Sequence, residues 1–180
     1  MPRHSYIAAI VLLMLALAPP VRGAEKTDAQ KKASVYAMYA DYRKEFPEVP
    51  DIHPLKAMKL ADAGRVVFVD TREPEEMAVS MLPDAVSKEA FLQNPSAYAD
   101  RQVIVYCTIS YRSGRFAREM ADRGIRLTNL KGGLLAWVLE GGPVMNAGKV
   151  TRRIHVYGRQ WALAPKGYET VVYPFWKRWF

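Results

Sequence analysis

The chain has 180 residues, a single cysteine and a formal net charge of +8, and 50% of its residues are hydrophobic. These values are typical of a soluble globular protein with one real core, and they exclude a disulfide-rich scaffold because one cysteine cannot form an internal disulfide. Before the C-terminal tail the basic residues are scattered rather than massed, so we expect no binding to nucleic acid and only a mild attraction for small anions.

The first 23 residues differ from the rest of the chain. Arg3 and His4 precede an apolar segment, residues 6–18, that is too short to span a bilayer. Two prolines and several small residues follow it. We therefore expect residues 1–23 to be a cleaved secretory signal peptide, which predicts a periplasmic or secreted protein. The alternative is an uncleaved membrane anchor.

A helical N-terminal extension is predicted for residues 24–50. Apolar side chains recur there at spacings of three and four: Val35, Met38, Tyr39 and Tyr42. That period is typical of a helix with one buried face, which we expect to pack on the outside of the following domain. Pro47 and Pro50 then force an extended connection.

The main body begins near Ile52. Pro54 suits the first position of a helix, and we read His53 as the residue that starts this helix rather than as a metal ligand. Residues 66–69 are continuously apolar and predict a strand covered on both faces. Asp70 and Arg72 follow at the carboxyl end of that strand, where ligands gather in open α/β sheets. They are candidates to border a site, and the alternative is an ion pair that fixes the loop.

Strands and helices continue to alternate further along the chain. Five segments carry this pattern: a brief strand at 85–86, a short helix at 88–93, a strand at 103–106, a helix at 112–123 and a strand at 125–130. Gly132 and Gly133 then open a helix that bears Trp137, which we expect in the core. The alternation predicts an α/β fold.

Cys107 lies between the strand at 103–106 and the helix at 112–123, in the sequence VIVYCTISYRSGR. Backbone N–H groups of such a loop, together with a helix N-terminus, favour a negative charge such as a thiolate. Arg112 adds a permanent cation with a forked set of donors. The pattern predicts a nucleophilic cysteine, and the alternative is an inert cysteine that ends a core strand.

The C-terminal tail, residues 146–180, mixes basic and aromatic side chains without a clean helical period. This mixture could lie at a membrane surface or bind a partner. The interpretation we favour is that the tail packs back on the domain, over the Cys107 loop.

The sequence resembles the rhodanese-like family of sulfurtransferases over residues 51–145. The family's active loop has a Cys, four intervening residues and an Arg, followed by Ser or Thr and Gly, and the chain has Cys107, Arg112, Ser113 and Gly114 at these places. An apolar strand followed by Asp70-Thr71-Arg72 resembles its Asp-x-Arg motif. The segment from Leu130 to Trp137 resembles its Leu-x-Gly-Gly-x-x-Ala-Trp motif.

The resemblance implies a small central, mostly parallel sheet flanked by helices on both faces. It also implies that Cys107 takes sulfane sulfur from thiosulfate or a similar small anionic donor as a persulfide, and passes it to a thiol or protein acceptor. Arg112 would bind the donor, and the hydroxyl of Ser113 would add a hydrogen bond. Thr108, Ile109, Ser110 and Tyr111 would form the rim. Neither a metal nor an organic cofactor is implied.

One loop position departs from the family. Ser110 stands where the family often has Gly, and a positive φ there would strain a serine.

The sequence is also compatible with two rival functions. The first is a non-catalytic binding module that docks a partner through its aromatic C-terminal extension. The second is phosphatase chemistry on a related Cys loop, although such loops have five residues between Cys and Arg and this one has four.

Overall fold

The computed structural model describes residues 25–173. The predicted signal peptide and the aromatic end of the tail, residues 174–180, lie outside the described residues. None of the helices within residues 25–173 has the length and hydropathy needed to cross a membrane.

A five-stranded sheet in the order β1-β5-β4-β2-β3 forms the centre of the domain, and all of its strand pairs are parallel. Its strands are β1 (Asp51–Ile52), β2 (Val66–Asp70), β3 (Val86–Ser87), β4 (Gln102–Tyr106) and β5 (Thr128–Leu130). Because parallel neighbours need crossover connections, helices separate these strands in the chain. The predicted fold class is confirmed.

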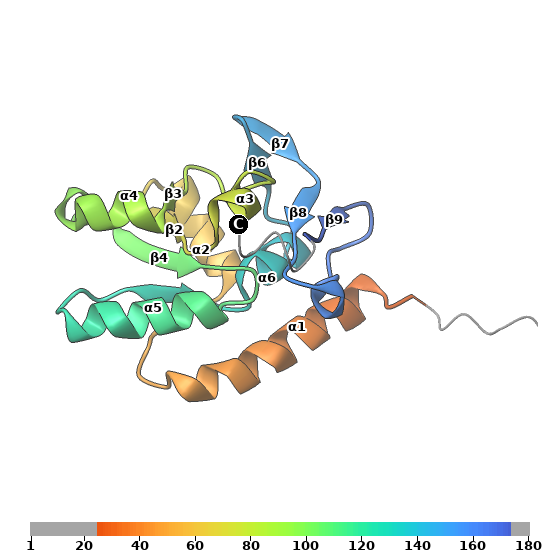
Figure 1. Cartoon of the computed structure of the whole chain (residues 1–180), viewed down its shortest axis with the longest axis horizontal. Coiled ribbons are helices and arrows are strands. Elements are labelled where there is room, and N and C mark those ends of the chain that lie inside the picture. The colour runs from red at the N-terminus through yellow and green to blue at the C-terminus, as the bar shows by residue number, and fades with distance from the viewer. Residues whose placement is uncertain (1–24, 174–180) are drawn as a thin grey trace, which may run out of the picture.

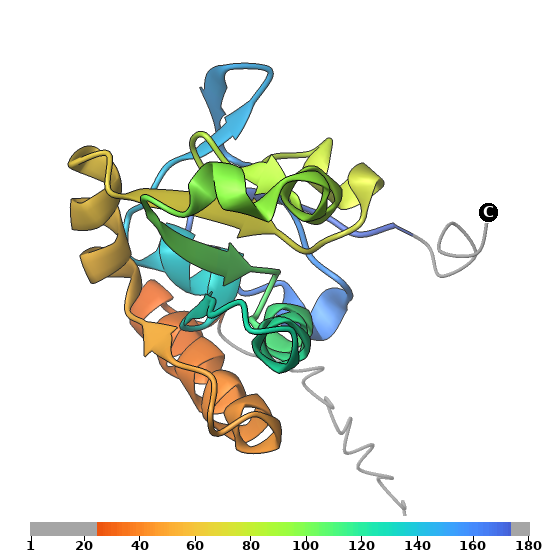
Figure 2. The same cartoon turned by 90° about the vertical axis from the view of Figure 1, so that its left-hand side faces the viewer.

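Helices cover both faces of the sheet (Figures 1 and 2). The helices on these faces are α1 (Asp28–Tyr42), α2 (Pro54–Asp62), α4 (Lys88–Gln93), α5 (Tyr111–Asp122) and α6 (Gly133–Leu139). The short helix α3 (Pro74–Met77) follows β2 and adds no residue to either core, and 3₁₀ turns lie at Arg43–Glu45, Pro95–Tyr98 and Arg159–Trp161. Phe68 and Ile104 face the core formed with α1, α2 and α6, whereas Val69 and Val105 face the core formed with α4 and α5. Successive strand residues point to opposite faces, so the continuous apolar runs serve both cores.

Several predicted elements agree with the structure. His53 caps α2, its Nδ1 accepting a hydrogen bond from the Leu55 N–H, and Pro54 is the first helical residue. Trp137 is buried, as expected.

The strand predicted for 125–130 is shorter. It begins at Thr128, because only Thr128 and Asn129 pair with β4. Leu127 is buried in the core formed with α5, so its apolar side chain reflects packing rather than membership of the strand.

After α6 the chain forms two further pairs of strands, and the second pair lies wholly in the tail. They are β6 (Val144–Asn146) with β7 (Lys149–Thr151), antiparallel, and β8 (Arg153–His155) with β9 (Glu169–Val171), parallel. Ile154, Val156 and Leu163 are buried in the same core as α6. In Figure 1, β4 points toward the part of the molecule where β8 and β9 lie. The described part of the tail, residues 146–173, therefore packs back on the domain, which agrees with the interpretation favoured by the sequence.

Candidate active site

Cys107 follows the last residue of β4 and is buried, with the N-terminus of α5 four residues further on. The N–H of Ser110 donates a hydrogen bond to the Cys107 Sγ, at 3.2 Å. The loop therefore turns back so that an amide points at the sulfur. Both this amide and the positive end of the α5 dipole stabilise negative charge at the sulfur atom.

Ser110 holds the turn of the loop in the left-handed region, with φ 71° and ψ 17°. Its hydroxyl donates to the carbonyl of Leu130, and its own carbonyl accepts from the Asn129 side-chain amide at 3.0 Å. A left-handed conformation costs a non-glycine residue about 1–2 kcal/mol. The hydroxyl contact offsets part of this cost, so side-chain bonding to β5 supports a turn that glycine would make without strain.

The start of α6 fixes the loop from the other side. The N–H groups of Leu134 and Leu135 donate to the carbonyls of Cys107 and Thr108, at 2.9 and 3.1 Å. Gly133 is necessary for this approach, because its φ is 60° and a Cβ there would collide with the Cys107 carbonyl and the Ile109 amide. The Gly-Gly pair in the sequence thus serves the Cys107 loop as well as its own helix.

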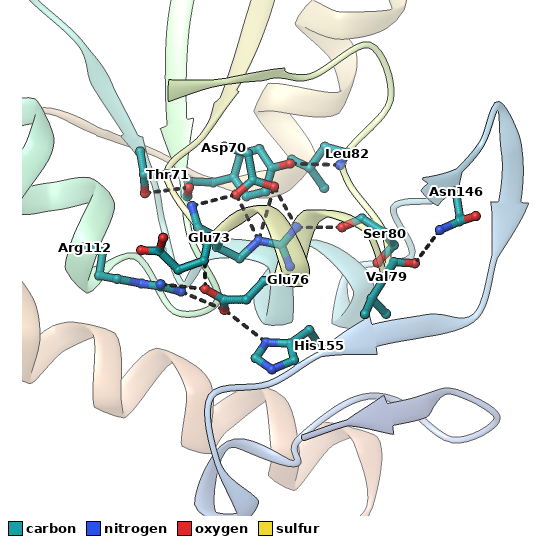
Figure 3. A network of polar contacts seen from close by, with 12 residues as sticks. Asp70, Thr71, Glu73, Glu76, Val79, Ser80, Leu82, Arg112, Asn146 and His155 are labelled. Carbon is teal, nitrogen blue, oxygen red and sulfur yellow. Dashed lines mark hydrogen bonds and ion pairs between the residues drawn. The ribbon is translucent and has the colours of Figure 1, made fainter. Parts of the chain in front are cut away.

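Glu76 joins Arg112 to His155 beside the loop (Figure 3). The two terminal nitrogens of Arg112 bind the two carboxylate oxygens of Glu76 at 2.6 and 2.9 Å. His155 Nδ1 lies 3.0 Å from Glu76 Oε1, and the N–H of Glu73 donates to Oε2 at 3.0 Å. Glu76 therefore accepts from three groups and bridges the loop arginine to the C-terminal extension.

The ionisation of this network follows from its contacts. Burial alone would raise the pKa of the Glu76 carboxyl, but the hydrogen bonds from His155 and Arg112 outweigh it and hold that pKa well below its usual range. Burial would likewise lower the pKa of Arg112, and its bonds to Glu76 and the nearby Cys107 raise it instead. Glu76 is thus a carboxylate and Arg112 a cation throughout the physiological pH range.

A cavity of about 900 Å³ opens above the Cys107 loop. Three parts of the chain line it, and Tyr42 of α1 completes the wall. The loop contributes Cys107, Thr108, Ile109, Tyr111 and Arg112. The α3 region contributes Glu73, Pro74, Glu75 and Glu76, and the C-terminal extension contributes His155, Tyr157, Trp161 and Tyr173. The cavity therefore has a sulfur atom in its floor and aromatic rings in its walls.

One contact joins the extension to the loop, and a second orders the extension itself. The guanidinium of Arg112 lies 5.6 Å from the ring centroid of Tyr157, and the rings of His155 and Tyr173 stack with centroids 4.9 Å apart. The hydroxyl of Thr108 is buried and has no hydrogen-bond partner within residues 25–173, so it is a further polar group at the cavity floor.

The structure brings together only some of the residues singled out from the sequence. Asp70 and Arg72 do not line the cavity: they form a fully buried pair, with Arg72 Nη2 2.6 Å from Asp70 Oδ2. This is the loop-fixing ion pair considered as their alternative role. Ser113 is buried as well, and its hydroxyl donates to Asn129 Oδ1 at 2.7 Å, so it supports the loop from behind.

Sequence reasoning missed Glu76 and His155. A signal for Glu76 was available, because Glu73 and Glu76 form a capping box at the start of α3, and that motif fixes the Glu76 carboxylate near the end of β2. For His155 no local signal existed, since it arrives from the extension through the pairing of β8 with β9. Within the described residues, no group of three or more His, Cys, Asp or Glu side chains is arranged to hold a metal ion.

Comparisons with known proteins indicate the family to which the chain belongs. The sequence model of the rhodanese-like domain matches residues 53–140. A sulfurtransferase of Allochromatium vinosum is 34% identical over 93 residues, which are 49% of this chain and 87% of that protein. An uncharacterized protein of Synechocystis is 33% identical over 98 residues, 52% of this chain and 55% of that protein.

Among solved structures, a rhodanese-related protein of Thermoplasma volcanium is 20% identical and superposes with a TM-score of 0.46, over 53% of this chain and 97% of that one. The parallel sheet and the Cys107 loop define an α/β protein with a cysteine at the carboxyl edge of its sheet. The chain belongs to the rhodanese-like domain family, whose members include sulfurtransferases.

Proposed function

We propose that the protein is an exported sulfurtransferase that takes sulfane sulfur from thiosulfate or a similar donor onto Cys107 and passes it to a thiophilic acceptor. The observation that carries this proposal is the position of the Cys107 sulfur. It lies at the floor of an open cavity and accepts a hydrogen bond from the Ser110 N–H. Export is inferred from the sequence of residues 1–23 alone.

The first half of the reaction is an attack on the donor. The Cys107 thiolate forms a bond to the outer sulfur of thiosulfate, the sulfur–sulfur bond of the donor breaks, and sulfite leaves with its electron pair. The persulfide left on Cys107 is again an anion, so the Ser110 amide and the α5 N-terminus stabilise it as they stabilise the thiolate.

Arg112 has a positioning role in this scheme as well as an electrostatic one. Because Glu76 holds its guanidinium in a fork, Arg112 stays beside the sulfur in one orientation. Glu76 offsets part of its charge, so the Ser110 N–H and the N-terminus of α5 supply the rest of the stabilisation of the anionic sulfur. In the second half of the reaction the acceptor attacks the outer sulfur and restores the Cys107 thiolate.

Mass spectrometry of the purified protein after treatment with thiosulfate tests the proposal. We expect the intact protein to gain one sulfur atom at Cys107, cyanide to remove it as thiocyanate, and Cys107→Ser to gain none. A folded wild-type protein that takes no sulfur from thiosulfate or from a polysulfide would overturn the proposal and favour a binding module instead.

A further inference from the structure

We propose that the sulfur acceptor is an organic thiol, which binds in the cavity above Cys107 and gives its proton to Nε2 of His155. This inference rests on the sulfurtransferase function proposed above. It assigns a catalytic base to the C-terminal extension, outside the residues that match the family.

His155 ends β8 and lines the same cavity as Cys107. Its side chain is only 6% exposed, and one ring nitrogen, Nδ1, lies 3.0 Å from Glu76 Oε1. Tyr173 stacks on the ring with an interplanar angle of 24°. The orientation of the imidazole is therefore fixed on its edge by a carboxylate and on its face by an aromatic ring.

The tautomer of His155 follows from what Glu76 can do. Glu76 also accepts from Arg112 and from the Glu73 N–H, and an ionised carboxylate has no proton to donate. The proton between the two side chains must then sit on His155 Nδ1. In the neutral imidazole this leaves a lone pair on Nε2, which is the arrangement of a base oriented by a carboxylate. Arg112 is the cation on the other side of Glu76.

The chemistry of a thiol acceptor needs such a group. A thiol is nucleophilic as its thiolate, and an ordinary alkyl thiol is mostly protonated at neutral pH. A base inside the site removes that proton while the thiol attacks. Imidazole is the side chain best suited to this transfer near pH 7.

The size and walls of the cavity indicate that the thiol is organic. A volume of about 900 Å³ is far larger than cyanide or sulfite needs and matches the usual range for organic ligands, about 300–1,000 Å³. Tyr42, Tyr111 and Trp161 supply aromatic surface. Such walls favour an acceptor whose carbon skeleton is apolar or aromatic.

The transfer step balances without an oxidant or a reductant. The thiol sulfur forms a bond to the outer sulfur of the Cys107 persulfide as its proton moves to His155. The bond between the outer sulfur and the Cys107 Sγ breaks, and its electron pair stays on Sγ as the thiolate. The products are an organic persulfide, a regenerated Cys107 thiolate and a protonated His155.

The sharpest variant is His155→Asn. The Asn side-chain amide can occupy the place of Nδ1 and still donate to Glu76, whereas nothing replaces the base at Nε2. The persulfide is first loaded from thiosulfate and quantified by mass spectrometry, which separates the donor half of the reaction from the acceptor half. Rates are then measured for transfer to substituted thiophenols, which are ionised at neutral pH, and to benzyl thiols of matched size, which are not.

We expect His155→Asn to slow transfer to benzyl thiols by about 100-fold, which is within the usual range for a general base. Transfer to thiophenols should change by less than about threefold, because these acceptors have no proton to lose. Raising the pH until the benzyl thiol ionises should restore the rate of the variant. An equal loss with both classes would mean a structural role for His155 and would overturn the inference.

His53→Asn is the matched control, because it makes the same exchange at the exposed cap of α2. It should leave both classes of acceptor at the wild-type rate. A wild-type protein that takes no sulfur onto Cys107 would contradict the proposed function itself. Normal loading of the variant with no dependence on the class of acceptor would contradict only the role of His155.

Discussion

Two carboxylate–arginine ion pairs lie near the carboxyl end of β2. The two ion pairs differ in their access to solvent. Asp70 and Arg72 form the first pair, and both of their side chains are 0% exposed. Glu76 and Arg112 form the second, with side chains that are 6% and 30% exposed. Both pairs have two or more hydrogen bonds between carboxylate and guanidinium. Only the second pair borders the cavity.

The difference in access separates a structural task from a chemical one. Arg72 also binds the chain itself, because its Nη2 donates to the Ser80 carbonyl at 2.6 Å, whereas its buried Nη1 has no hydrogen-bond partner within residues 25–173. Burial alone would lower the pKa of Arg72, and the charge of Asp70 raises it instead. The enclosed pair therefore fixes the loop after β2, while the partly open pair holds a cation beside Cys107.

Asp70→Asn should have the largest effect on stability. It leaves the guanidinium of Arg72 buried without its counter-charge, which costs about 3–5 kcal/mol for a pair of this kind. Guanidinium chloride denaturation at pH 7 measures the loss.

A double variant tests the reason for that loss. Asp70→Leu combined with Arg72→Met removes both charges and should be more stable than Asp70→Asn alone, because no unpaired charge is left in the core. A double variant that is less stable than the single one would indicate that other contacts of Arg72, including the one to Ser80, dominate.

Glu76→Gln should destabilise the fold by less, about 2 kcal/mol at pH 7, because Arg112 keeps some contact with solvent. The effect should depend on pH. Since the pKa of Glu76 is lower in the folded protein than its usual 4.5, its ionisation stabilises the fold above that value and loses this contribution as the pH falls below it. Denaturation at pH 7 and at pH 3.5 should therefore show a gap between wild type and variant that narrows in acid.

Glu75→Gln controls for the loss of a negative charge, since Glu75 is an exposed neighbour on the same helix. It should change stability by less than about 0.5 kcal/mol at either pH. A Glu76→Gln gap that stays constant between pH 7 and 3.5 would contradict the assignment of a depressed carboxyl pKa.

Much of the fold was predictable from local pattern. Continuous apolar runs indicated strands covered on both faces, and the position of Cys107 between a strand and a helix followed from the change of period after Tyr106. Glycine and proline marked helix starts at Pro54 and Gly133. These signals succeeded because each depends on neighbours within one turn or one strand.

The site was less predictable, because its second half comes from distant segments. Glu76 and His155 are 79 residues apart in sequence and meet only after the extension folds over α3. Asp70 and Arg72 were difficult for another reason. Their position after the strand correctly placed them at the carboxyl edge of the sheet, but their burial depends on the packing of the folded chain. Sequence pattern gives the direction of a strand, but not which of its terminal side chains keeps access to solvent.

Arg112→Lys tests whether the ion pair of Glu76 and Arg112 acts through its geometry or only through its charge. Lysine keeps the charge and cannot bind both oxygens of Glu76 in a fork, so we expect sulfur loading to slow by about tenfold. Arg115→Lys, an exposed exchange on the same helix, is the control. Arg72→Lys should show the reverse profile, with lower stability and an unchanged rate per folded molecule. Equal rates for all three variants would remove the distinction between the two pairs.

Substitutions of Ser110 should have the smallest effect on stability. This residue fixes the Cys107 loop through a hydroxyl hydrogen bond rather than through a charge. Ser110→Ala keeps the left-handed strain and loses the hydrogen bond to Leu130, and should cost about 1 kcal/mol. Ser110→Gly loses the same bond and also relieves about 1 kcal/mol of strain, so its stability should stay near that of wild type. Thermal and denaturant unfolding of the two variants measure this ordering. If alanine proved as stable as glycine here, the positive φ of the loop would carry no cost, and the departure from the family's usual glycine would need another explanation.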